Sequence, residues 1–118
     1  FTSAGVAQCP LPPPGTRATV AVHHAEAVSW LQQHDGRFAV ALVDPMFDRP
    51  RRAHPTFDLV RRHACHEPLT DRLLDAVLAK ADRVVVRVGH PSTVERLARA
   101  PIRTLRSGTT FWAVFAGR

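Results

Sequence analysis

The residues of this sequence whose types and spacing best suit chemistry are Asp44, Pro45, Met46 and Phe47, which directly follow the apolar run FAVALV. If that run is a strand of an open α/β sheet, the tetrapeptide stands at its carboxyl end, where such sheets bind ligands. A carboxylate and a proline carbonyl held in place by a fixed φ can accept hydrogen bonds from the hydrogens of an exocyclic amine. The Phe47 ring would stack on the base that carries this amine. The motif therefore suits methylation of a base amine by positioning, without a strong base.

A plain turn is the alternative interpretation of the same four residues. Asp and Pro are both common in turns, so a strand followed by an Asp-Pro turn would produce this pattern without any chemistry. The uninterrupted apolar run before Asp44, and the alternation of strands and helices around it, favour the chemical interpretation.

The elements that must position this motif are predicted from hydrophobic periodicity. Strands are expected at 17–23, 38–43, 83–88, 102–105 and 110–116. Helices are expected at 24–34, 55–64, 69–81 and 91–100. The order β-α-β-α-α-β-α-β-β predicts an α/β fold with a mostly parallel, doubly wound sheet of about five strands, which a final antiparallel hairpin closes. The proline-rich residues 1–16 are expected to form a linker or loop before a domain at 17–118.

Two of the predicted strands carry a specific expectation about burial. The runs at 38–43 (FAVALV) and 83–88 (RVVVRV) are nearly continuously apolar rather than alternating. Such runs are typical of central parallel strands with helices packed on both faces. Both strands are therefore expected in the middle of the sheet.

Composition bounds the class of partner. The chain has 118 residues, 45% of them hydrophobic, and a formal net charge of +6. A basic balance of this size favours a polyanion such as RNA. Lys80 is the sole lysine, and a GC-rich genome that inflates Arg, Ala and Pro is the plainer explanation of the charge.

Membrane and secretory classes are disfavoured by the same sequence. No apolar run approaches the roughly 20 residues of a membrane span, and the N-terminus lacks the pattern of a signal peptide. Cys9 and Cys65 define no disulfide framework, which favours free thiols in a reducing cytoplasm. The H-x-C-H run at His63, Cys65 and His66 lacks a second ligand pair at zinc spacing, so no metal is expected.

The motif, with its flanking segments, resembles motif IV of amino-group methyltransferases. With Met in third place, Asp44-Pro45-Met46-Phe47 looks most like the bacterial small-subunit (16S) ribosomal RNA guanine-N2 methyltransferase family. The segments VAVHHAEAVSWL, FAVALVDPMF, RVVVRV and RSGTTFWAVFAG resemble that family's successive elements. The resemblance covers about residues 17–117 and is sharp at the tetrapeptide.

The resemblance implies a fold, a cofactor and residue roles. The fold would be the C-terminal half of a Rossmann-like class I sheet, whose strand order is 3-2-1-4-5-7-6, and the cofactor would be S-adenosylmethionine. Asp44, Pro45 and Phe47 would be catalytic, and Asp44, Glu26 and Ala27 would contact the cofactor. Glu26 departs from the family's small hydroxyl residues, and an exposed glutamate that favours a helix start is an equal alternative. Substrate RNA would contact these residues: Met46, Phe47, Arg49, Arg51 and Arg52. A solvated basic loop is the alternative for the three arginines.

The Gly-rich turn that begins this family's fold is missing. No G-x-G pattern occurs anywhere in the chain. The strand at 17–23 would be number three and that at 38–43 number four, so strands one and two would be absent between them and strand four would expose an edge. We therefore expect the chain to belong to a longer protein, or to form a homodimer if it is complete.

Several functions stay open at this level. The favoured one is methyl transfer to a guanine N2 amine in small-subunit ribosomal RNA, in the cytoplasm, with the ribosomal RNA or small subunit as partner. A non-catalytic RNA-binding remnant of the fold is an alternative. A related DNA or protein amino-group methyltransferase is another, and an α/β interaction domain with a chance motif is the last.

Overall fold

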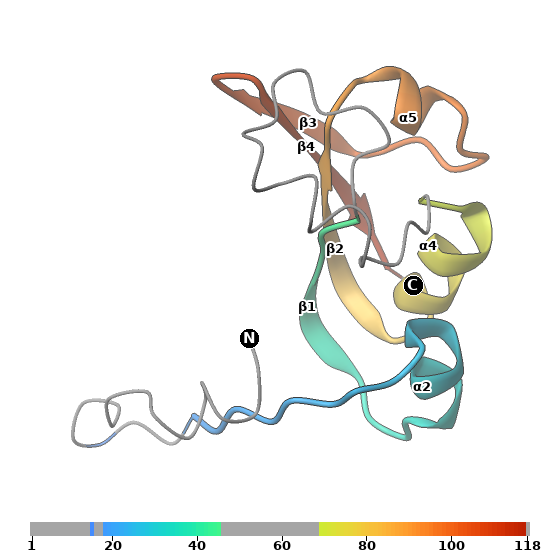
Figure 1. Ribbon diagram of the computed structural model, residues 1–118, viewed down its shortest axis with the longest axis vertical. Helices are drawn as coiled ribbons and strands as arrows, with labels where there is room; N and C mark the ends of the chain where they lie inside the picture. Colours follow the sequence, from blue (N-terminus) through green and yellow to red (C-terminus); the bar gives the residue numbers. More distant parts are fainter. Residues whose placement is uncertain (1–14, 16–17, 46–68, 118) are drawn as a thin grey trace, which may run out of the picture.

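A computed structural model describes residue 15 and residues 18–45 and 69–117 of the chain. In chain order, the described elements are α2 (Ala27–Gln33), β1 (Phe38–Val43), α4 (Asp71–Leu78), β2 (Ala81–Val88), α5 (Ser92–Glu95), β3 (Arg103–Ser107) and β4 (Thr110–Ala116). Figure 1 shows the three helices together on one side of a twisted sheet. The described part of the chain is therefore a two-layer α/β arrangement.

The sheet is mixed and has the order β1-β2-β4-β3. β1 pairs with β2 in parallel, whereas β4 is antiparallel to both β2 and β3. A tight turn joins β3 to β4, and Gly108 occupies it with a φ of +59°, a conformation that side chains disfavour. The predicted closing hairpin is confirmed, and β2 is a central strand as expected.

The core lies between the sheet and the helices. Val84, Val86 and Val88 of β2 alternate with polar or half-buried neighbours and face α4, from which Leu74 fills the space above them. The helix predicted at 69–81 buries Leu74, Val77 and Leu78, whereas Leu69 and Leu73 are partly buried and pack against the core. Thr70 begins α4 by accepting a hydrogen bond from the Leu73 N–H at 3.2 Å.

Two predictions about strands are wrong. The segment 17–23 was expected to be a strand, but its described residues 18–23 form none, and Val20 is 70% exposed. A strand needs a partner for its backbone groups, and no described strand pairs with this segment. β1 has the predicted bounds, but it is an edge strand and not a central one, since β2 is its one neighbour in the described sheet.

The remaining elements differ from expectation at their ends. The helix predicted at 24–34 begins three residues later, because Glu26 caps it. The helix predicted at 69–81 ends earlier than expected, because β2 already begins at Ala81. The helix at 91–100 shortens to the single turn α5, in which Val94 is buried. The helix predicted at 55–64 and the linker at 1–16 lie outside the described residues, apart from Gly15.

The two faces of the sheet make a testable contrast between leucines. Leu74 is 1% exposed in the core and Leu42 is 66% exposed on β1. Leu74→Ala should cost about 2–5 kcal/mol of unfolding free energy, because it leaves a cavity. Leu42→Ala should cost less than about 0.5 kcal/mol. Urea denaturation measures both values, and equal losses would contradict this assignment of the faces.

Candidate functional site

Asp44 directly follows β1 at its carboxyl end, and its carboxylate turns toward the sheet face opposite the helices. There Oδ2 lies 3.6 Å from Nη1 of Arg87, which comes from the neighbouring strand β2. The two side chains are 55% and 39% exposed. At this distance the contact is an ion pair rather than a hydrogen bond, and exposed pairs contribute little to stability. Its consequence is orientation, because a guanidinium on one side favours one position of the carboxylate.

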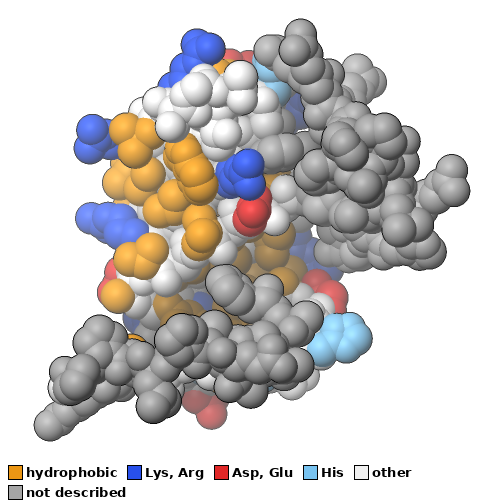
Figure 2. Space-filling view, turned by 60° about the vertical axis from the view of Figure 1, so that its left-hand side comes forward, with side chains coloured by type: hydrophobic (Ala, Val, Ile, Leu, Met, Phe, Trp, Pro, Cys, Tyr) orange, Lys and Arg blue, Asp and Glu red, His pale blue; other side chains and the backbone are white. Residues whose placement is uncertain are grey.

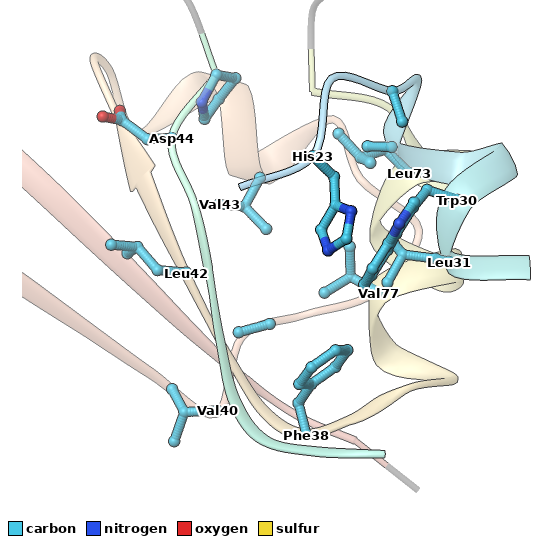
Figure 3. A pocket seen from close by; sticks show the side chains of 14 residues that line it. His23, Trp30, Leu31, Phe38, Val40, Leu42, Val43, Asp44, Leu73 and Val77 are labelled. Atoms are coloured by element: carbon cyan, nitrogen blue, oxygen red, sulfur yellow. The ribbon is translucent and has the colours of Figure 1, made fainter. Parts of the chain in front are cut away.

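A cavity of about 660 Å³ runs along the free edge of β1. Figure 3 shows its walls, with Phe38 and Val43 on one side of the strand and Val40, Leu42 and Asp44 on the other. Side chains of α2 and α4 close the helix side. The wall is mainly apolar, which suits a ligand with an apolar body, and the Asp44 carboxylate borders the cavity on the face of β1 away from the helices.

Aromatic rings form a stack beside this cavity. The Trp30 ring lies 5.1 Å from His23 and 4.8 Å from His34, and the His34 ring lies 4.8 Å from Phe38. His34 and Phe38 are nearly parallel, at 10° between their planes. His23, Trp30 and Phe38 also line the cavity. The arrangement gives the cavity an aromatic wall whose rings pack on one another, with His23 tilted by 40° against Trp30.

This wall was not among the predicted site residues. A signal was present in the sequence, because Trp30, His34 and Phe38 recur at intervals of four, which places the first two on one helix face. Phe38 joins them because β1 begins beside the end of α2, a contact that sequence spacing does not reveal.

Glu26 is placed as the N-cap of α2. Its carboxylate accepts hydrogen bonds from the N–H of Ser29 at 2.7 Å and of Val28 at 3.2 Å. The bond from the Ser29 backbone holds the pKa of Glu26 below its ordinary value. The cap provides the helix-start role that was the alternative interpretation, and Glu26 does not line the cavity. A contact between Glu26 and a cofactor stays a prediction.

The structure thus brings part of the predicted site together. Asp44, Pro45 and Ala27, which come from two elements, line the same cavity. The other predicted residues, Met46, Phe47, Arg49, Arg51 and Arg52, lie outside the described residues. His63, Cys65 and His66 do so as well.

The described residues hold no group of three metal-ligating side chains. Within the same part of the chain, no helix has the length and hydropathy needed to cross a membrane.

The cap of α2 predicts a pH-dependent stability. Since the folded pKa of Glu26 is depressed, its contribution is fully present above the ordinary value of 4.5 and is lost as the pH falls through the folded value. Glu26→Gln should therefore lower the melting temperature at pH 7, and the difference from the parent chain should shrink below pH 4.5. Thr70→Ala removes an uncharged cap from α4 and is the control, because its effect should not follow this pH dependence. Thermal melts across pH 3–7 measure both, and a Glu26→Gln difference that does not change with pH would contradict the assignment.

Comparison with known proteins gives no assignment. No family model matches the chain, and no curated protein matches it.

Proposed function

We propose that this chain takes part in methyl transfer from S-adenosylmethionine to the exocyclic N2 amine of a guanine in small-subunit ribosomal RNA, in the cytoplasm. In this proposal it supplies the C-terminal half of a class I methyltransferase sheet. This sequence contains no Gly-rich turn of the kind that such folds use to hold the methyl donor.

The observation that carries the proposal is the topology around Asp44. The sheet order β1-β2-β4-β3, with β4 antiparallel, agrees with the second half of the order 3-2-1-4-5-7-6 that the sequence resemblance implies. In this numbering β1 is strand four, and the Asp44-Pro45 pair follows it at the position of motif IV. This agreement in strand order supports the chemical interpretation of the motif over a chance Asp-Pro turn.

The chemistry available at Asp44 fits the proposed reaction. The lone pair of a guanine amine is delocalised into the ring, so the amine is a weak nucleophile. The Asp44 carboxylate and the Pro45 carbonyl can accept its two hydrogens and direct the lone pair out of the ring plane. Arg87 at 3.6 Å keeps the carboxylate on one side of the strand end. These groups position the amine, and no general base is required.

The described residues fit one part of the cofactor. S-adenosylmethionine, when bound, supplies the methyl group. The aromatic and apolar wall made by Trp30, Phe38 and Ala27 on the helix side of β1 suits its adenine ring, and the Asp44 carboxylate lies beyond the strand end on the opposite face (Figure 3). Groups to hold the methionine end are not among the described residues, so the fit concerns the adenine side. This is why a longer protein or a second subunit is part of the proposal.

Calorimetric titration with S-adenosylhomocysteine tests the site. The chain should bind it weakly, through the adenine side alone, and Asp44→Ala should abolish this binding or weaken it by about tenfold or more. Glu95→Ala is the matched control, because it removes an exposed carboxylate from α5, away from the cavity. A folded chain whose affinity is unchanged by Asp44→Ala would contradict the role of this carboxylate.

A methyl-transfer assay tests the substrate. Small ribosomal subunits, naked ribosomal RNA and DNA are compared as acceptors, with transfer to a guanine N2 expected and an Asp44→Ala loss of about 10²-fold or more. Transfer to DNA or to a protein amide would replace the proposed substrate. Salt-sensitive RNA binding without any cofactor binding would instead support a non-catalytic RNA-binding remnant.

A further inference from the structure

The sheet face opposite the helices is apolar and has a basic margin. The strand register places one set of apolar side chains on this face: Val40, Leu42, Val85, Val114, Trp112 and Leu105. Val40, Leu42 and Leu105 are 61%, 66% and 43% exposed. Figure 2 shows hydrophobic side chains gathered on one side of the molecule with Lys and Arg side chains around them. We call this surface the open face.

The sequence of the open face is that of a buried surface. β1 is apolar on both of its faces, which is typical of strands covered on both sides. In the described part of the chain, α2, α4 and α5 cover one side and no element covers the other (Figure 1). An apolar surface that spans four strands marks an interaction site on a protein.

Charge selects among the possible occupants. Arg83 projects from the open face beside Val40, and Arg103 projects from it at the β3 edge, beside Val114. Both side chains belong to exposed residues. A second copy of the chain would bring a further net charge of +6 to a face whose margin is already basic, which like-charge repulsion disfavours. The segments 1–17 and 46–68 carry more arginine than acid, so they do not complement the margin either.

The types of side chain on the open face favour a protein partner over single-stranded RNA. Single-stranded RNA stacks its bases on aromatic rings, and of the described residues on the open face Trp112 is the one aromatic. The others are aliphatic, which bases and phosphates cover poorly. Four strands span about 14 Å, enough for one α-helix of about 10 Å diameter. The shape and chemistry suit a helix whose apolar stripe is bordered by acidic residues.

We propose that the open face docks an amphipathic helix with an acidic border, supplied by a polypeptide of different sequence. Its apolar stripe covers Leu42, Val85, Val114 and Trp112, and its acidic residues pair with Arg83 and Arg103. This inference concerns the face opposite α4 and does not depend on methyl transfer.

Binding of designed peptides to the full chain tests the proposal. The probe is a fluorescein-labelled 18-residue helix with a leucine stripe bordered by glutamates. The control peptide has the same sequence with lysine at every glutamate position. The acidic peptide should bind saturably in fluorescence anisotropy, and the lysine peptide should bind about tenfold more weakly or not at all. Equal affinity for the two peptides, or no binding of either, would overturn the proposal.

Charge reversal locates the binding on the open face. The double change Arg83→Glu and Arg103→Glu should weaken the acidic peptide about tenfold and strengthen the lysine peptide. Arg96→Glu, at the end of α5 on the helix side, is the matched control and should change either affinity less than about twofold. Circular dichroism checks that the double variant is folded. If it is not, Arg103→Gln replaces it, and this single change should weaken binding of the acidic peptide about twofold to threefold.

A spectroscopic measurement adds a second readout. In a Trp30→Phe background Trp112 is the remaining tryptophan, and its emission should shift to the blue when the helix covers it. An unchanged spectrum at saturating peptide would overturn the proposed location. Displacement of the peptide by single-stranded RNA would assign the face to RNA instead. A chain that sediments as a dimer and becomes monomeric with Leu105→Glu would assign it to a second copy.

Discussion

The packing of β2 against α4 is the constraint on which the rest of the described structure depends. β2 is hydrogen-bonded on both sides, in parallel to β1 and antiparallel to β4, and its valines at 84, 86 and 88 are essentially inaccessible to solvent. Because side chains alternate along a strand, burying these three residues fixes Arg83, Val85 and Arg87 on the opposite face. The position of Arg87 beside Asp44 is thus a consequence of the core.

β1 depends on this strand for all of its described pairing. Its register against β2 decides that Val43 faces the helices and that the residue after it, Asp44, turns to the open face. A shift of one residue would exchange these faces and carry the carboxylate away from Arg87. The position of Asp44 relative to Arg87 therefore depends on the β1–β2 register. Ala41 and Val43 stabilise this register by packing on the core.

Sequence reasoning predicted the elements that carry their own burial pattern. The helix predicted at 69–81 and the strand predicted at 110–116 are confirmed, because their hydrophobic periodicity is clear. The strand at 17–23 and the central position of β1 were wrong for one shared reason. An apolar run indicates that a segment prefers burial, but it does not show whether other elements of the described chain pack against that segment. The aromatic wall was missed because Phe38 meets α2 through tertiary packing.

The open face and the cavity along β1 are not independent surfaces. Val40 and Leu42 belong to both, since they project from the open face and line the cavity around the free edge of β1. A helix docked over these residues would close one side of the cavity and exclude water from the region of Asp44. Water exclusion strengthens the hydrogen bonds that a carboxylate makes to a ligand amine. Ligand binding in the cavity and helix docking on the open face should therefore be coupled, and each should raise the affinity of the other by the same factor.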